Sequence, residues 1–187
     1  MIIALTGDRL VGKSEVARHL VNNQGFVRVH PFDGGKAMCK AYYKHIGFDE
    51  ETSERMINGD LKGTHMEALP YGESPRYLMA EIGKFIPTLG LEWTLGAEIE
   101  RVRRIYGEID MVIESLVYEE AVVRAYPNNI IVKIERNSSM IGAHSSRAVQ
   151  TVIPDITVEN NGSLDTLFAF FDGIVQAERA KYVHHNG

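Results

Sequence analysis

The sequence contains little cysteine, no long apolar run and no excess of positive charge, and each of these absences excludes a class of protein. Cys39 is the only cysteine among 187 residues, so the chain can form neither an internal disulfide nor a multi-cysteine zinc site. No apolar run approaches the length of a transmembrane helix. The formal net charge of −5 provides no general attraction to nucleic acid polymers and suits free nucleotides better. We therefore expect a cytoplasmic protein without membrane or nucleic acid partners, with Cys39 half-buried on a helix.

The first residues of the chain are apolar, but they do not form the pattern of a signal peptide. Residues 1–6 read Met-Ile-Ile-Ala-Leu-Thr and show neither a basic leader nor a cleavage site. Their length and their content of Ile and Leu predict a buried parallel strand. Val16, Ala17, Leu20 and Val21 follow with helical spacing. The segment between these two patterns is therefore a loop that joins a strand to a helix.

This loop carries the most specific motif of the chain. Residues 7–14 read Gly-Asp-Arg-Leu-Val-Gly-Lys-Ser, a complete G-x-x-x-x-G-K-S phosphate-binding loop. Gly7 and Gly12 let the backbone bend so that successive N–H groups point inward, next to the positive end of the following helix. Lys13 can then reach the outer phosphates of a nucleoside triphosphate, and the Ser14 hydroxyl can bind Mg²⁺. The predicted nucleotide-binding residues are Gly7, Asp8, Arg9, Leu10, Val11, Gly12, Lys13 and Ser14.

The remainder of the chain alternates between strand and helix patterns. Predicted strands cover residues 26–30, 109–113, 130–134 and 156–158. Predicted helices cover residues 36–45, 91–105, 118–124 and 164–182, and a further one begins after Ser74 and Pro75. Such alternation behind a phosphate-binding loop predicts an α/β fold of the P-loop NTPase type, in which a parallel sheet is flanked by helices.

Two polar segments interrupt this pattern. Residues 47–75 are weakly periodic and contain several glycines, which indicates an excursion from the sheet. Residues 136–150 are also polar. We expect a single kinase-like domain over residues 1–187, with a helical, acceptor-binding insertion at about residues 33–90 and a lid at about residues 136–150.

A phosphate-binding loop alone does not distinguish a kinase from a GTPase or a mechanical ATPase. The chain has no N-K-x-D guanine motif, and Asp60 and Gly63 have the D-x-x-G spacing of a GTPase switch without a core strand before them. Large ATPase modules also need a longer chain. A small phosphotransferase fits better, because it needs an acceptor pocket and a mobile cover that excludes water. Arg76, Arg136 and Arg147 are candidates to neutralise phosphate charge, although an arginine taken alone is more often an exposed surface residue.

Four further segments carry short motifs of one kinase family. Residues 32–36 (Phe-Asp-Gly-Gly-Lys) look like its A-D-P-L-K element, and residues 75–83 look like its P-R-x-L-M-Q-x-x-G element, with Ala80 in place of Gln. Residues 144–147 are similar to its H-x-S-E element, and residues 158–164 to its I-x-N-x-G-S-L ending. In this order, over nearly the whole chain, the sequence resembles the bacteriophage deoxynucleoside monophosphate kinases, within the wider nucleoside monophosphate kinase group.

This resemblance implies a specific reaction and a role for individual residues. The γ-phosphoryl group of ATP would pass to a deoxynucleoside 5′-monophosphate, with Mg²⁺ as cofactor and without a covalent intermediate. The phosphate-binding loop would hold ATP, Asp33, Lys36 and Arg76 would face the acceptor, and Arg136 with Arg147 would close over the phosphates. The adenine would lie near Asn160, Asn161 and Gly162.

The chain departs from that family after the third core strand. Where the family has D-x-R, residues 114–117 read Glu-Ser-Leu-Val, so Glu114 is the only acid at the strand end. Glu114 could hold the Mg²⁺ shell through water, or it could be a plain capping residue. Arg147 stands where the family has Glu. These changes leave open a shifted acceptor range, a divergent member, a dephospho-coenzyme A kinase-like enzyme of the same architecture, or a nucleotide-binding module with weak catalysis.

Three aromatic residues and the oligomeric state also leave alternatives open. Trp93 could bind substrate by stacking on a base, although a lone Trp between Leu91 and Leu95 has the pattern of a core residue. Tyr42 and Tyr43 could line the acceptor pocket or simply pack their helix. The sequence does not decide between a monomer and a homodimer.

Overall fold

The structure, a computed structural model, describes residues 1–137 and 151–183. The chain divides into two compact units. The first, which we call the sheet unit, comprises Met1–Pro31 and Ile99–Gly187. The second, the helical unit, comprises Phe32–Glu98 and therefore extends further than the insertion expected at about residues 33–90. Most of the expected lid, including Arg147, lies outside the described residues.

The sheet unit is built on five parallel strands. They are β1 (Ile2–Thr6), β2 (Val27–Val29), β3 (Met111–Ile113), β4 (Asn129–Glu135) and β5 (Ile156–Glu159). Their order in the sheet is β2-β3-β1-β4-β5, and each neighbouring pair is parallel. The strand that precedes the phosphate-binding loop is thus central, and its carboxyl end emerges between β3 and β4. Ligands of open parallel sheets bind at this edge.

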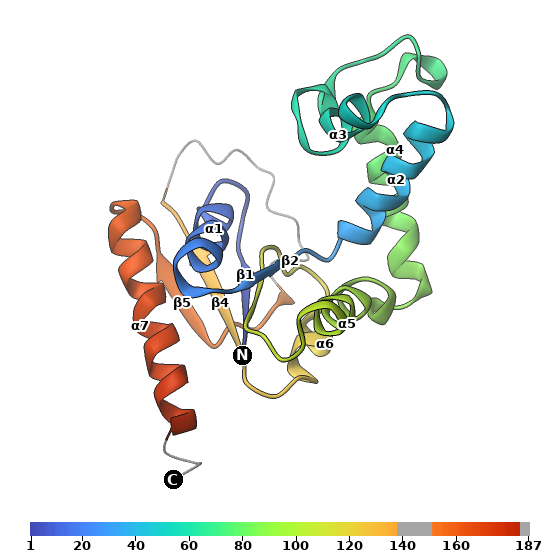
Figure 1. Cartoon of the computed structure of the whole chain (residues 1–187). Coiled ribbons are helices and arrows are strands. Elements are labelled where there is room, and N and C mark those ends of the chain that lie inside the picture. The colour runs from blue at the N-terminus through green and yellow to red at the C-terminus, as the bar shows by residue number, and fades with distance from the viewer. Residues whose placement is uncertain (138–150, 184–187) are drawn as a thin grey trace. The chain divides into compact units, whose positions relative to one another are not determined.

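Helices cover both faces of the sheet, as Figure 1 shows. On one face lie α1 (Lys13–Gln24) and α7 (Leu164–Val183), and on the other lie α5 (Leu95–Tyr106) and α6 (Glu120–Arg124). All five residues of β1 are buried, as expected for a strand covered on both sides. The predicted α/β class, a parallel sheet flanked by helices, is confirmed. No helix within residues 1–137 and 151–183 is both long enough and apolar enough to cross a membrane.

The helical unit has a small core of its own. It consists of α2 (Asp33–His45), α3 (Glu50–Asn58), α4 (Pro75–Phe85) and short 3-10 turns at Asp60–Gly63, Pro70–Gly72, Ile86–Leu89 and Leu91–Trp93. The Tyr43 hydroxyl donates to the carbonyl oxygen of Pro75 at 2.9 Å, which ties the start of α4 to α2. The buried residues that form this core are Cys39, Tyr43, Met56, Ile57, Leu69 and Met79.

Cys39 is more deeply buried than we expected from the sequence. It is 1% exposed within the core of the helical unit, whereas we predicted a half-buried position. Burial raises the pKa of its thiol to about 11. The thiol therefore stays protonated near neutral pH, and Cys39 acts as a small apolar core residue.

The helix α3 lies inside residues 47–75, the segment that we expected to leave the sheet. Its start is well defined, because the Asp49 carboxylate accepts a hydrogen bond from the Thr52 N–H at 2.6 Å. Glu50 and Glu51 occupy the first turn, where acidic side chains favour the helix dipole. We predicted no separate helix over these residues, because α3 is short and its buried face contains a polar residue, Ser53.

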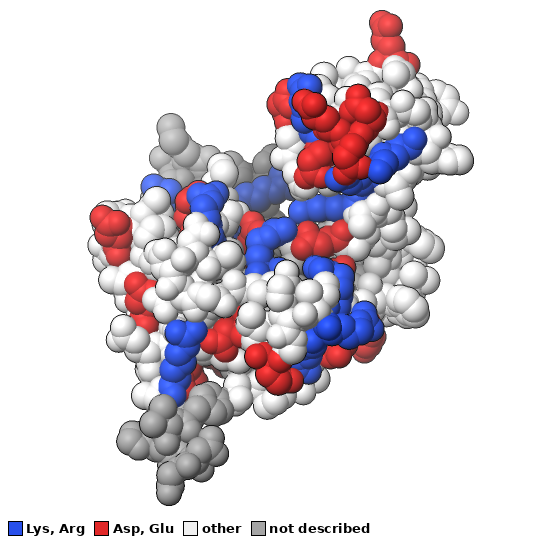
Figure 2. Space-filling view, in the orientation of Figure 1, with Lys and Arg blue, Asp and Glu red and all other residues white. Residues whose placement is uncertain are grey.

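Ion pairs connect α2 and α3 at the surface of the helical unit. The Lys40 ammonium lies 2.7 Å from Glu50 and 2.6 Å from Glu54, and Lys44 lies 2.6 Å from Glu50. Figure 2 shows acidic side chains gathered over α3 with basic side chains next to them. Exposed pairs of this kind contribute little to stability because water and salt screen them. The apolar core, rather than these pairs, holds the three helices together.

Candidate phosphate-binding site

Residues 7–12 form the connection between β1 and α1, and two glycines determine its path. The φ angle is 128° at Gly7 and 110° at Gly12, in a region that residues with a side chain rarely adopt. A Cβ atom at Gly7 would overlap the carbonyl oxygen of Ile134, and one at Gly12 would lie 2.8 Å from the side-chain nitrogen of Asn160. Both positions therefore require glycine for conformation and for space.

Asn160, the residue directly after β5, supports this loop. It is buried, with an exposed fraction of 4%, and its Nδ2 donates to the carbonyl oxygen of Val11 at 2.9 Å. Its backbone N–H donates to the carbonyl oxygen of Glu135, at the end of β4, at 2.7 Å. Asn160 thus fixes the loop to the β4 and β5 ends of the sheet.

Lys13 is the first residue of α1, and its side chain turns back onto the loop. The ammonium group donates to the carbonyl oxygen of Gly7 at 2.7 Å and also to that of Asp8. Burial lowers the pKa of Lys13, while the charges of Asp8 and Glu114 act in the opposite direction. A partly desolvated cation at the N-terminus of a helix is a suitable site for phosphate oxygens.

Ser14 contacts the acid that we singled out after the third core strand. Its hydroxyl donates to Oε1 of Glu114 at 2.6 Å, and Arg28 from β2 donates to Oε2 of the same carboxylate at 2.5 Å. Burial alone would raise the pKa of Glu114, but the hydrogen bonds from Ser14 and Arg28 outweigh it and hold the pKa below its usual value. Glu114 is therefore a charged carboxylate at neutral pH.

The backbone places Glu114 beside the loop through its neighbours in the sheet. Its N–H donates to the carbonyl oxygen of Val29 at 3.0 Å, and the N–H of Leu116 donates to that of Leu5 at 2.8 Å. The chain after β3 thus continues along the carboxyl ends of β2 and β1. This position explains how two residues a hundred positions apart, Ser14 and Glu114, come into contact.

The Ser14 and Glu114 oxygens are suitable ligands for Mg²⁺. Magnesium ions are typically held by one or two carboxylates together with substrate phosphates and water, rather than by a cage of protein ligands. The described residues contain no cluster of three or more His, Cys, Asp or Glu side chains that could hold a metal by themselves. Ser14 and Glu114 would hold the ion directly or through water.

A cavity of about 560 Å³ lies above the loop. This volume is within the range of roughly 300 to 1,000 Å³ that is usual for small-molecule sites. The residues that line it are Leu10, Gly12, Lys13, Ser14, Glu15, Arg136, Asn160, Gly162 and Leu164. The structure thus places Arg136, Asn160 and Gly162 around one cavity with residues of the phosphate-binding loop.

Asn161 is arranged differently from its two neighbours. Its Oδ1 accepts a hydrogen bond from the N–H of Asn137 at 2.8 Å, and its Nδ2 donates to Glu159 at 3.0 Å. Asn161 therefore binds Asn137, while Asn160 binds the loop.

The residues predicted to face the acceptor all belong to the helical unit. Asp33 and Lys36 lie in the first turn of α2, with Lys36 Nζ 3.3 Å from Asp33 Oδ1. Arg76 is the second residue of α4 and is exposed. Each of these side chains therefore lies near the N-terminus of a helix, where the backbone also attracts anions.

The three aromatic residues with open alternatives differ from one another. Trp93 is 68% exposed, so the core interpretation is wrong for it. It ends the 3-10 turn Leu91–Trp93, ahead of the helix α5 that begins at Leu95. Tyr43 is buried in the core, whereas Tyr42 is 45% exposed, and both line a pocket of the helical unit.

Arg28 is a site residue that the sequence analysis missed. It lies on β2, opposite Val112 of β3, and reaches the Glu114 carboxylate. An exposed arginine on an edge strand has no sequence signal for such a contact, because its partner Glu114 lies 86 positions away along the chain.

Comparison with known proteins gives a likeness in fold alone. No protein-family model matches the sequence, and none of the curated proteins matches it. The crystal structure of TT1252 from Thermus thermophilus is 18% identical, with a TM-score of 0.48 over 95% of this chain and 97% of that chain. Dephospho-CoA kinase from Campylobacter jejuni is 14% identical, with a TM-score of 0.47 over 94% of this chain and 95% of that chain. Because one fold serves many reactions, the function has to be argued from the site.

Proposed function

We propose that the protein is a kinase that transfers the γ-phosphoryl group of ATP to a deoxynucleoside 5′-monophosphate. The observation that carries the proposal is the contact of 2.6 Å between the Ser14 hydroxyl and the Glu114 carboxylate, beside the Lys13 ammonium. A triphosphate with its metal ion needs a cation, a hydroxyl and an acid in this arrangement. The choice of acceptor rests on the resemblance of residues 32–36 and 75–83 to the phage kinases.

The helical unit supports a kinase over a GTPase. A nucleotide hydrolase uses water as its acceptor, whereas a kinase needs a second binding region, and this chain devotes Phe32–Glu98 to a compact unit of its own. The D-x-x-G segment has a structural role there, because Asp60 binds Arg55 through two hydrogen bonds of 2.9 and 2.7 Å. That pairing ties the turn Asp60–Gly63 to the end of α3.

The residues of the sheet unit would act by positioning and by charge. In the transfer, the bond between the γ-phosphorus and the oxygen of ADP breaks while a bond to an acceptor phosphate oxygen forms. Lys13 and the loop N–H groups would hold the phosphates and offset their negative charge, and Arg136 would add a second cation from the wall of the cavity. Mg²⁺, when bound at Ser14 and Glu114, would supply further positive charge to the phosphate oxygens.

The residues of the helical unit would hold the acceptor. Lys36 and Arg76 provide two cations for its monophosphate, and Asp33 positions Lys36 through their contact of 3.3 Å. Bidentate binding of phosphate is a property of arginine in particular. We therefore assign Arg76 the main contact with the acceptor phosphate.

The test is diphosphate formation by the purified protein with ATP, Mg²⁺ and a panel of acceptors. The panel contains deoxynucleoside and ribonucleoside monophosphates and dephospho-coenzyme A. We expect transfer to at least one deoxynucleoside monophosphate, and none from a Lys13→Ala variant that folds normally. Transfer to dephospho-coenzyme A alone would replace the acceptor class, and ATP binding without transfer to any acceptor would overturn the kinase proposal.

A further inference from the structure

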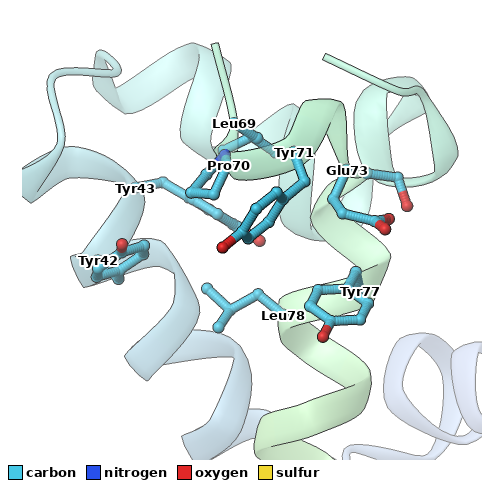
Figure 3. Close-up of a pocket in the computed structure, with 9 residues that line it drawn as sticks. Tyr42, Tyr43, Leu69, Pro70, Tyr71, Glu73, Tyr77 and Leu78 are labelled. Carbon is cyan, nitrogen blue, oxygen red and sulfur yellow. The ribbon is translucent and has the colours of Figure 1, made fainter. Parts of the chain in front are cut away.

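The helical unit contains a pocket that the residues discussed so far do not explain. Its volume is about 240 Å³. Figure 3 shows that Tyr42 comes from α2, that Tyr77 and Leu78 come from α4, and that Tyr71 and Glu73 come from the connection before α4. Aromatic and apolar side chains thus make up most of its wall.

The charge of this pocket excludes a phosphate group as its ligand. None of the lining residues is Lys, Arg or His, and Glu73 is the one acid among them. The Glu73 side chain makes no hydrogen bond or ion pair within residues 1–137 and 151–183. A half-buried carboxylate without a protein partner favours a ligand that donates hydrogen bonds.

The tyrosines present aromatic surface that the core does not use. Tyr77 is 54% exposed, and Tyr71 is fully exposed. Tyr71 also has a φ angle of 59°, a strained conformation for a residue with a side chain. The Tyr71 ring thus lies at the pocket without being buried against other side chains. Exposed apolar side chains that gather around one cavity are typical of a binding site.

We propose that this pocket binds a planar nitrogen-containing ring, the base of the acceptor nucleotide, with its N–H groups on the Glu73 carboxylate and its face on the tyrosine rings. In taking the ring to be that base, the inference rests on the proposed function. A single ring system suits the volume of about 240 Å³, because pockets for whole ligands usually measure roughly 300 Å³ or more. Stacking on aromatic side chains is a common way to hold a base.

The Glu73 carboxylate also predicts the order in which the four bases bind to the pocket. Guanine presents a ring N–H next to an exocyclic amino group, so both can donate to the two oxygens of Glu73. Adenine and cytosine present an amino group next to a ring acceptor. Thymine presents one N–H between two carbonyl oxygens, which the carboxylate repels. We therefore expect guanine to bind best and thymine to bind worst.

The experiment measures binding of nucleosides to the full chain by NMR chemical shifts. Deoxyguanosine, deoxyadenosine, deoxycytidine and thymidine carry no phosphate, so the phosphate-binding loop does not contribute to the result. We expect Glu73→Gln to weaken binding of deoxyguanosine about tenfold or more. Tyr77→Ala is expected to weaken all nucleosides, about tenfold. The matched control is Glu67→Gln, because Glu67 is an exposed glutamate of the same unit that does not line the pocket.

Each outcome of this experiment decides the proposal. Equal binding of the four nucleosides, no binding by any of them, or unchanged affinity in both pocket variants would overturn it. Because the tested side chains lie outside the core, the variants should melt at the temperature of the unchanged protein, and a loss of binding then reports the pocket. Nucleoside binding without phosphoryl transfer would overturn the proposed kinase reaction but not the proposed base-binding pocket. Phosphoryl transfer without nucleoside binding would overturn the pocket but not the kinase reaction.

Discussion

The two units of the chain expose their polar and aromatic groups in opposite ways. In the sheet unit the site groups already have protein partners: Asn160 binds Val11, Ser14 binds Glu114, and Lys13 binds the carbonyl oxygens of its own loop. In the helical unit, Tyr71, Tyr77 and Trp93 are exposed. The difference teaches that the phosphate end is held in shape before any ligand binds. The acceptor end, in contrast, presents surface whose partner must come from the ligand.

The strongest way to break this comparison is to remove the cation of the phosphate-binding loop. Lys13→Ala is expected to lower kcat/KM by roughly 10²- to 10³-fold or more, because the loop loses its one ammonium group while the charge of the phosphates stays. Steady-state kinetics with ATP measure the effect. Lys84→Ala is the control, since Lys84 is an exposed lysine paired with Glu81. Similar losses in both variants would remove Lys13 from the site.

The second change tests the acid of the same unit. Glu114→Gln keeps the size of the side chain but removes its charge. We therefore expect kcat to fall roughly 10²-fold, and we expect the variant to require a higher Mg²⁺ concentration for its full rate. A titration of the rate against Mg²⁺ concentration measures both effects. An unchanged Mg²⁺ requirement would show that Glu114 does not bind the ion and is a capping residue only.

The third change is in the helical unit, and it should affect the KM of the acceptor but not the KM of ATP. Arg76→Ala is expected to raise the KM of the acceptor roughly tenfold to a hundredfold, because a hydrogen bond to a charged group is worth about 1.5–3 kcal/mol. The KM of ATP should stay within a factor of two or so. Initial rates with each substrate varied in turn give both constants. Unchanged acceptor kinetics would remove Arg76 from the site.

The fourth change tests how firmly the loop is held. Asn160→Ala leaves the carbonyl oxygen of Val11 without its buried donor and should lower the free energy of unfolding by about 1–3 kcal/mol. Asn161→Ala, at the exposed neighbour, should change it by no more than about 0.5 kcal/mol. Chemical denaturation of the two variants measures the difference. Equal stabilities would show that the loop does not depend on Asn160.

The smallest expected effect concerns pH. Arg28 helps to hold the pKa of Glu114 below its usual value, so the carboxylate keeps its charge, and its share of stability, until the pH falls through that lowered pKa. Removing the guanidinium with Arg28→Gln raises this pKa and should therefore move the acidic loss of activity to higher pH. The pH profile of kcat/KM measures the shift. A profile that keeps its acidic limb in place would show that Arg28 does not act on Glu114.

The phosphate-binding loop and the sheet could be predicted because their signals are local. Gly7, Gly12 and Lys13 stand at fixed spacing behind an apolar strand, and β3 is likewise a short apolar run. The contacts that complete the site are different in kind. Asn160 with Val11 and Arg28 with Glu114 join segments far apart in the sequence, and only the parallel order of the strands brings them together.

The helical unit was harder to predict because its elements are short. The N-cap of α3 at Asp49 was present in the sequence, but the helix has only nine residues. We expected a core position for Trp93 from its apolar neighbours Leu91 and Leu95, but it ends a 3-10 turn and is 68% exposed. Short elements depend on tertiary packing more than on the repeat of their own residues, and a single sequence does not contain that packing.

The helix α5 belongs to both units at once. Its first residues, from Leu95 to Glu98, fall in the helical unit, and the rest, from Ile99 to Tyr106, fall in the sheet unit. The hydrogen-bond ladder of this one helix therefore runs across the boundary between Glu98 and Ile99. The helical unit therefore cannot unfold completely without fraying the first turn of α5. Amide exchange along this one helix would then record the local stability of each unit separately, with the change at Ile99.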